Sequence, residues 1–356
     1  MISRLHSRSI YSIRKQTWIQ ASILLWILIF LCGCQKNELE LNKFVVIPAK
    51  DSGVDFNNVL DESESLNYFT YPYLYMGGGV AIGDINNDGL DDLFFTGNMV
   101  PNKLFLNKGD FKFDDITNLA GLSGDDRWYA GVTMVDINSD GFLDIYVSVS
   151  GKDKTTTNQL FVNNGDLTFT ENAQEYGIAD SGKSVQSTFF DYDKDGDLDL
   201  YVANYPITSF ATPNEMYRKL MDEVTLENSD HLYRNDGKGH FSDVTAEAGV
   251  LSFGLSLSAT IGDLNGDGWE DIYVSNDFST PDYLYLNNGD GTFKESLKKT
   301  TKQTSFYGMG VDISDFNNDG LLDIMQVDMA AENNRRAKAN MASMNPDLFW
   351  STVDFG

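Results

Sequence analysis

Cysteine and histidine are scarce in this sequence, which limits both the disulfides that it can form and the reactions that it could catalyse. The only cysteines, Cys32 and Cys34, lie together near the N-terminus, so the rest of the chain can form no internal disulfide. Of three histidines, His231 and His240 stand beside no serine or cysteine pattern of an activated nucleophile. We therefore expect no enzyme and no catalytic residues, and we expect something other than disulfides to hold the loops.

Positive charge is scarce as well. Lysine and arginine number 26 against 53 aspartates and glutamates, which leaves a formal net charge of −27. A protein that binds nucleic acid neutralises phosphates with lysine and arginine. This composition therefore excludes nucleic acid as a partner.

The sequence has no apolar run long enough to cross a membrane. The longest, Ala21 to Leu31, covers eleven residues after a basic start, as in a secretory signal peptide. It ends in Leu31-Cys-Gly-Cys34, which resembles a bacterial lipobox. A plain signal peptide and a short signal anchor are the alternatives.

By that resemblance, residues 1–33 are a removed signal peptide and Cys34 carries the lipid. The polar residues 34–43 would be a tether. The expected location is the outer membrane of the cell envelope, on either side of it. The only expected membrane contact is this N-terminal lipid.

What the sequence has in abundance is one acidic motif of nine residues. It places side-chain oxygens at its first, third, fifth and ninth positions and glycine at its sixth. Ca²⁺ takes about six to eight oxygen ligands, and the turn that gathers them needs a residue free to adopt positive φ. The five copies are Asp84–Asp92, Asp136–Asp144, Asp191–Asp199, Asp263–Asp271 and Asp315–Asp323.

Each loop is expected to bind one structural Ca²⁺ ion, about five ions in all. The side-chain ligands would be Asp84, Asn86, Asp88, Asp92, Asp136, Asn138, Asp140, Asp144, Asp191, Asp193, Asp195, Asp199, Asp263, Asn265, Asp267, Asp271, Asp315, Asn317, Asp319 and Asp323. The seventh position would add a ligand from Leu90, Phe142, Asp197, Trp269 and Leu321. We expect no other cofactor.

Two other interpretations of the loops are an EF-hand and plain Asp-rich turns. An EF-hand needs flanking helices and an acidic ligand at position twelve. That position holds Phe95, Val147, Val202, Val274 and Gln326, all inside predicted strands. Plain Asp-rich turns do not need a ninth-position carboxylate in all five copies. Calcium loops remain the better interpretation.

The loops mark an internal repeat, because their starts lie 52, 55, 72 and 52 residues apart. Such periods are typical of propellers and solenoids. In each unit an apolar run enters the loop, a β-rich run leaves it, and two further strands flank a tight Gly-containing turn. Four antiparallel strands make a propeller blade. The sequence predicts an all-β propeller over residues 44–329.

Several segments depart from this repeat. Residues 205–229 lengthen unit three, and a capping-box arrangement at Thr212–Glu215 predicts a helix over 213–224. The β-like runs 44–47 and 53–58 would supply outer strands to the last blade. The fifth unit shows only strands 308–313 and 323–327, and residues 330–356 begin helix-like. We expect an N-terminal fragment of a longer protein.

The acidic loops and the third-strand turns together resemble the FG-GAP/VCBS repeat, the blade of integrin α-subunit propellers. The turns are Leu104–Phe111, Leu160–Leu167, Leu232–Gly239 and Leu284–Gly291. The resemblance covers residues 71 to about 330, and it is strongest to bacterial relatives of cartilage acidic protein and the ASPIC/UnbV family. It implies calcium-loaded blades that bind a ligand on the face away from the loops.

Blade geometry itself separates two faces, because the first and third connections of each blade emerge at the same end. We expect structural calcium on that face and a binding or adhesion site for an unknown protein or glycan on the other. Phe253 and Phe306 enter first strands, where channel plugs are more common than ligand contacts. A polysaccharide lyase or hydrolase and a scaffold subunit of an outer-membrane uptake complex stay open as alternatives.

Overall fold

The computed structural model describes residues 44–151, 155–206, 212–277, 280–305, 307–329 and 335. The chain divides into two units, residues 1–47 and 48–356, and the repeated sheets lie in the second. The expected signal peptide, Cys34 and the tether fall outside the described residues, as does 330–356 apart from residue 335. No helix in the described ranges is long and apolar enough to cross a bilayer.

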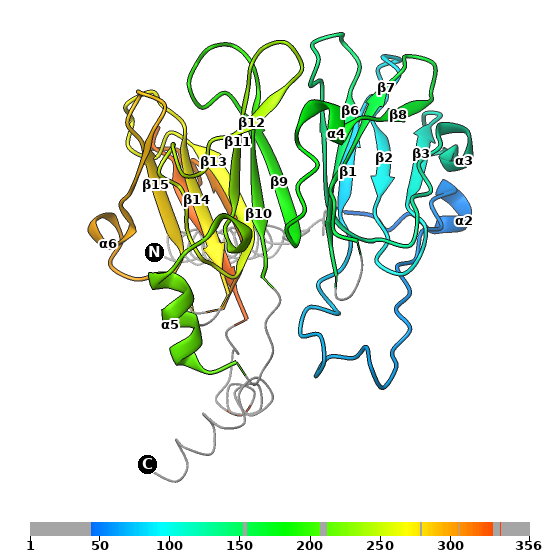
Figure 1. Ribbon diagram of the computed structural model, residues 1–356. Coiled ribbons are helices and arrows are strands. Elements are labelled where there is room, and N and C mark those ends of the chain that lie inside the picture. Colours follow the sequence, from blue (N-terminus) through cyan, green and yellow to red (C-terminus); the bar gives the residue numbers. More distant parts are fainter. Residues whose placement is uncertain are drawn as a thin grey trace, which may run out of the picture. The chain divides into compact units, whose positions relative to one another are not determined.

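Four antiparallel sheets of four strands follow one another along the chain, and a two-stranded hairpin comes last (Figure 1). The four sheets are β1 (Val80–Gly83), β2 (Asp92–Phe95), β3 (Lys103–Asn107), β4 (Phe113–Asp115); β5 (Trp128–Val135), β6 (Asp144–Ser150), β7 (Gln159–Asn163), β8 (Phe169–Glu171); β9 (Ser184–Phe190), β10 (Asp199–Asn204), β11 (His231–Asn235), β12 (Phe241–Asp243); and β13 (Ser256–Gly262), β14 (Asp271–Asn276), β15 (Tyr283–Asn287), β16 (Phe293–Glu295). The hairpin is β17 (Gly308–Ser314) and β18 (Asp323–Asp328). The predicted all-β, four-stranded repeat is confirmed.

The first strands of consecutive sheets lie side by side, in the order β1, β5, β9, β13 and β17. Hydrophobic residues fill the space between each pair of neighbouring sheets. Every residue of β6, β10 and β14 is therefore buried. A strand buried on both faces is built from a continuous apolar and β-branched run rather than an alternating one, as these sequences are.

Short helices follow the fourth strand in three of the sheets. They are α3 (Thr117–Ala120), α4 (Ala173–Tyr176) and α6 (Leu297–Thr300). The first two end at Gly121 and Gly177, both left-handed with φ of 76° and 78°. The residues that follow these glycines, Leu122 and Ile178, are fully buried, so the chain packs into the core directly after each helix.

The N-terminal runs do not form the predicted strands. Residues 44–47 are irregular, and the chain from 48 to 58 contains only a short helix, α2 (Ala49–Ser52), which ends at the left-handed Gly53. Phe56 stacks on Phe95 with ring centroids 5.1 Å apart, and Asn58 hydrogen-bonds Asn98. This segment packs on the first sheet, so the prediction of outer strands for the last blade is wrong.

The long insert in the third sheet forms helix α5 (Asn214–Asp222) and a 3₁₀ turn, η1 (Leu226–Asn228). The helix was predicted, and it begins directly after Pro213, which makes no side-chain cap. Proline fixes the entry angle instead, with φ of −67°. The helix packs inward through Tyr217, which is 2% exposed.

Aromatic side chains close the end of the sheets where the insert lies. Phe253 is 1% exposed and packs on Tyr217 with ring centroids 6.4 Å apart. Trp128 and Tyr129 are buried as well, and Trp128 meets Tyr71 edge to face at 5.6 Å. Phe253 is thus buried, as expected of a packing residue rather than a ligand contact, while Phe306 lies outside the described residues.

Candidate functional site

The first-position aspartate organises each acidic loop. In the first loop, Asp84 accepts hydrogen bonds from the backbone N–H of Asp88 at 3.1 Å and of Gly89 at 2.7 Å. The same two bonds, from the fifth and sixth N–H groups, occur in the other four loops. All five loops therefore share one backbone conformation.

That conformation contains two left-handed residues rather than one. The sixth-position glycines have φ between 84° and 95°, as the motif predicts. The fourth position is left-handed too, at Asn87, Ser139, Lys194, Gly266 and Asn318. Sequence reasoning missed this position. Its signal was the absence of β-branched residues and the presence of glycine or asparagine in three of five copies.

The third and fifth side chains face each other. Asn86, Asn138 and Asn265 donate through Nδ2 to the fifth-position carboxylates at 3.1, 2.9 and 2.8 Å. The fifth-position carboxylate also accepts from the N–H of the seventh residue in every loop. The third- and fifth-position side chains therefore lie against each other in these three loops.

The ninth-position aspartate ties the loop to the third strand. Asp92 accepts from the N–H of Ile85 at 3.0 Å and, through its other oxygen, from the N–H of Asn107 at 2.7 Å. The pattern repeats at Asp144, Asp199 and Asp271, all fully buried. Asp323 accepts from the loop N–H of Phe316 at 3.2 Å, and in the described residues β17 and β18 have no third strand that could supply the second bond.

Burial acts strongly on these ninth-position carboxylates. It raises the pKa of Asp144 to about 6 and that of Asp199 to about 7, although two backbone N–H groups oppose the shift in each case. Neighbouring aspartates of the same loop raise both pKa values further. A bound cation would offset both the burial and the repulsion.

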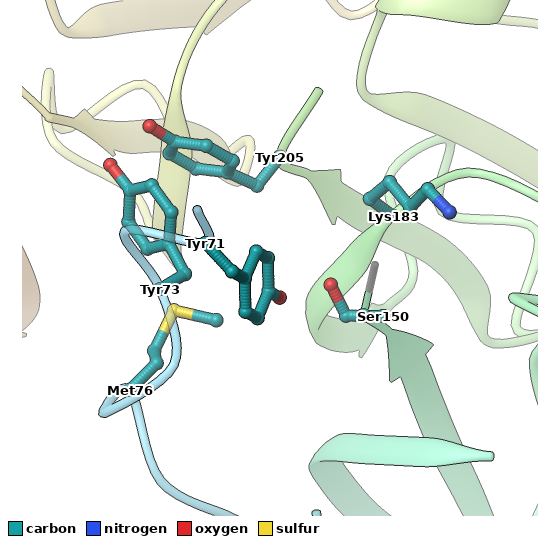
Figure 2. A pocket seen from close by; sticks show the side chains of 7 residues that line it. Tyr71, Tyr73, Met76, Ser150, Lys183 and Tyr205 are labelled. Carbon is teal, nitrogen blue, oxygen red and sulfur yellow. The ribbon is translucent and has the colours of Figure 1, made fainter. Parts of the chain in front are cut away.

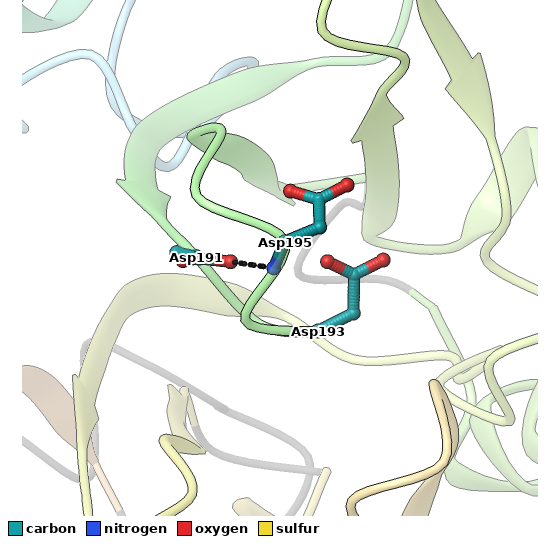
Figure 3. A group of neighbouring side chains, drawn as sticks. All are labelled: Asp191, Asp193 and Asp195. Atoms are coloured by element: carbon teal, nitrogen blue, oxygen red, sulfur yellow. Dashed lines mark hydrogen bonds between the residues drawn. The ribbon is translucent and has the colours of Figure 1, made fainter.

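The third loop has the most acidic residues of the five, and Figure 3 shows three of them, Asp191, Asp193 and Asp195. One carboxylate oxygen from each of Asp191, Asp193 and Asp195 lies within 4.8 Å of the others. Asp193 Oδ1 is buried and has no hydrogen-bond partner. Converging carboxylate oxygens, here with one of them unpaired, are hard donors of the kind that Ca²⁺ prefers. The residues of this loop therefore fit Ca²⁺.

Neighbouring loops bond to one another along one end of the sheets. Asn87 donates to the carbonyl of Gly141 at 2.9 Å, and Lys194 donates to that of Gly268 while lying 4.3 Å from the centre of the Trp269 ring. Two of the asparagines that end third strands reach back to the previous loop: Asn163 donates to the carbonyl of Ile85 and Asn287 to that of Tyr192, both at 2.8 Å. These bonds join the first loop to the second and the third loop to the fourth.

A second polar network lies at the opposite end and was missed from the sequence. Asp230 accepts from Tyr201 Oη at 2.9 Å, from the N–H of Asn204 at 2.7 Å and from Ser256 of the next sheet at 2.8 Å. Asp282 accepts in the same way from Tyr273, Asn276 and Gln326. The available signal was an Asn or Asp two residues before the leucine of each third strand, at Asn102, Asn158, Asp230 and Asp282.

His231 belongs to a structural ion pair rather than a catalytic pair. Its Nδ1 contacts the buried Asp180 carboxylate, and its Nε2 lies 2.8 Å from the carbonyl of Leu226 in the insert. Both partners are acceptors, so the ring must donate twice and is an imidazolium. Burial opposes this charge, but the hydrogen bond and the charge of Asp180 raise the pKa of His231 to about 9. The pair fastens the insert to the connection before β9.

Raising the pH is expected to weaken this fastening. A group whose pKa is raised by folding stabilises the fold fully below its unfolded value, near 6.5, and that stabilisation is lost as the pH rises through about 9. His231→Gln should lower the free energy of unfolding by about 1.5–3 kcal/mol at pH 6, which is the usual contribution of a hydrogen bond to a charged group. At pH 10 the loss should be much smaller. Urea unfolding from pH 6 to 10 measures this. The control is the exposed His240→Gln, and an H231Q cost independent of pH would contradict the prediction.

A shallow pocket lies at the same end as the insert (Figure 2). Its enclosed volume is about 10 Å³, enough for about one water molecule. Tyr73 and Tyr205 pack with ring centroids 3.7 Å apart, and Tyr73 donates to Asp277 at 2.5 Å. The lining residues are Tyr71, Tyr73, Met76, Ser150, Gly151, Lys183 and Tyr205. These rings bury one another, so the pocket belongs to the aromatic cluster that closes this end of the sheets and is not a substrate cleft.

Comparison with known proteins agrees with this geometry. The FG-GAP-like repeat family model matches residues 84–147, 148–202, 223–274 and 263–325. Cartilage acidic protein 1 of Homo sapiens is 31% identical over 268 residues, which is 69% of this chain and 38% of that protein. The proteins of the same name from Xenopus tropicalis and Mus musculus are 31% and 30% identical over 271 and 272 residues, 69% of this chain and 39% of each relative.

The chain thus spans less than two fifths of the length of these relatives. Each family match contains an acidic loop and sheet strands of the kind described above. The repeated loops, the four-stranded sheets and these matches together show that the chain belongs to the FG-GAP-like repeat family and is homologous to cartilage acidic protein 1.

Proposed function

We propose that this chain is a calcium-stabilised binding or adhesion module of the cell envelope, held by a lipid at Cys34. It would recognise a protein or a glycan with the face opposite its acidic loops. FG-GAP-like repeats build modules of the protein-binding and adhesion type. The observation that carries the proposal is the unequal distribution of side chains between the two ends of the sheets.

The loop end has the features of a structural face. Its five loops share one conformation, and Asn87, Asn163, Lys194 and Asn287 bond the first loop to the second and the third to the fourth. Bound Ca²⁺ would supply charge neutralisation and cross-links between the loop and the strands that flank it. Asp84, Asn86 and Asp88 in the first loop, and their equivalents elsewhere, would hold it.

The opposite end carries a helix and a loop segment that lie outside the repeated strands, and binding sites often lie on such segments. It carries helix α5 of the insert and the segment 61–76 that precedes β1 (Figure 1). Phe69 is 76% exposed and Tyr75 is 58% exposed, and Tyr68 contacts both rings at 5.9 and 6.3 Å. Exposed aromatic rings on a surface loop suit protein or glycan recognition, since they offer much contact area at low entropic cost.

A polysaccharide lyase or hydrolase and a scaffold subunit remain the alternative proposals. A glycan-cleaving enzyme needs a cleft with two carboxylates on either side of the bond. The pocket described here holds about one water, and His231 is engaged in its ion pair with Asp180. These observations favour binding over catalysis.

Replacing the exposed rings tests the proposal. Phe69→Ala/Tyr75→Ala should lower binding to a glycan array, or cross-linking to envelope proteins, at least about tenfold, because one or two aromatic contacts contribute that much. Phe111→Ala is the matched control, since Phe111 is 67% exposed in the β3–β4 turn at the loop end.

Two outcomes would overturn the proposed binding face. One is a wild-type protein that binds nothing on either assay. The other is an equal loss in the double variant and in Phe111→Ala. Cleavage of an arrayed acidic glycan by the wild-type protein would favour the enzyme alternative.

A further inference from the structure

We infer that the third loop, Asp191–Asp199, is the tightest of the five calcium sites and that Asp193 makes it so. This inference rests on the proposed calcium role of the loops. It concerns the ranking of the sites, which the repeated motif alone does not decide.

The first argument is charge. The third loop carries aspartate at its first, third, fifth, seventh and ninth positions, whereas each other loop carries acid at three of these positions. Calcium loops bind more tightly as the number of charged ligands rises. The third loop should therefore attract Ca²⁺ most strongly.

The second argument concerns the charge and the hydrogen bonds of the third-position side chain. In the first, second and fourth loops this residue is asparagine, and its amide donates to the fifth-position carboxylate. In the third loop Asp193 can donate nothing, so Asp193 and Asp195 repel each other. The buried Asp193 Oδ1 has no partner. A cation would relieve this repulsion and pair that oxygen, a gain that the asparagine loops lack.

The charged groups around the loop mostly support this ranking. Glu270, which precedes Asp271 in the neighbouring sheet, interacts with Asp191 and adds negative charge. Lys194 is directed away, to the carbonyl of Gly268 and the face of Trp269. Arg234 is the one cation that acts on Asp193 in the described part of the loop's surroundings, and it lies on the exposed side of β11. The local charge stays strongly negative.

Calcium titration of the full chain tests the inference through a pair of matched variants. Asp193→Asn gives the third loop the third-position asparagine of the other loops, and Asn138→Asp gives the second loop the third-position aspartate of the third. Isothermal titration calorimetry would measure affinity classes, native mass spectrometry the number of ions, and circular dichroism the fold. Both substitutions keep the side-chain shape, so the fold should survive.

In the wild-type protein we expect one ion bound at least about tenfold more tightly than the rest. Asp193→Asn should remove this tight class while the number of ions stays the same. Asn138→Asp should create a second tight class, which keeps the inference testable even if Asp193→Asn misfolds.

The outcomes separate this inference from the proposed function. Calcium bound with equal affinity at every loop, or a tight class that survives Asp193→Asn, overturns the ranking and leaves the calcium role standing. A wild-type protein that binds no calcium overturns both.

Discussion

Removal of calcium with a chelator is expected to lower the thermal unfolding midpoint by on the order of 10 °C or more. Two carboxylates about 4 Å apart repel by on the order of 4 kcal/mol at an effective dielectric constant of 20. Each of the five loops gathers several carboxylates. A change of 1 kcal/mol shifts the midpoint of a domain of this size by about 2–4 °C.

Scanning calorimetry with and without a chelator measures the effect. Added magnesium should restore little of the midpoint, because Mg²⁺ demands octahedral geometry and gives up its water reluctantly. High salt is the second control, since it screens exposed carboxylates and should recover part of the loss. A midpoint that does not change on chelation would show that the loops need no ion.

Replacing the buried ninth-position aspartate is expected to cost stability even without calcium. Asp271→Ala leaves the N–H groups of Leu264 and Asn287 without the acceptors they reach at 2.9 and 2.8 Å. A buried unpaired donor costs about 1–3 kcal/mol, so two should cost about 2–6 kcal/mol. The fifth-position variant Asp267→Ala removes an exposed loop side chain instead.

The comparison of these two variants separates the structural role from the metal role. With calcium present, both should lower the urea unfolding midpoint. With a chelator, Asp271→Ala should stay strongly destabilised, whereas Asp267→Ala should approach the wild type. Equal effects in the chelator would mean that the bonds of Asp271 to Leu264 and Asn287 contribute nothing beyond ion binding.

This distinction could not be drawn from the motif. The sequence treats Asp84 and Asp92 as two ligands of the same kind, because both recur at fixed spacing. In the structure Asp84 shapes its own loop, while Asp92 reaches the N–H of Asn107 in β3. The second contact joins residues 15 apart in the chain, and only strand pairing brings them together.

The errors of sequence interpretation have a similar cause. The sequence of residues 53–58 predicts a strand, but a strand needs a partner, and Phe56 instead stacks on Phe95. His231 and Asp180 lie 51 residues apart in the chain, and their pair joins β11 to the connection before β9. No local sequence pattern could therefore predict it. The left-handed fourth position was hidden because asparagine, serine and lysine are also ordinary turn residues.

The sequence by itself determined the repeat, the order of strands and the acidic loops, because each is specified within about nine to twenty residues by φ preferences and turn chemistry. Tertiary structure alone decided which carboxylates are buried, which oxygens stay unpaired and what covers the opposite face. Burial and pairing depend on neighbouring sheets, as the buried Asp193 Oδ1 and the closed aromatic plug show. Those are the quantities on which calcium affinity and binding depend.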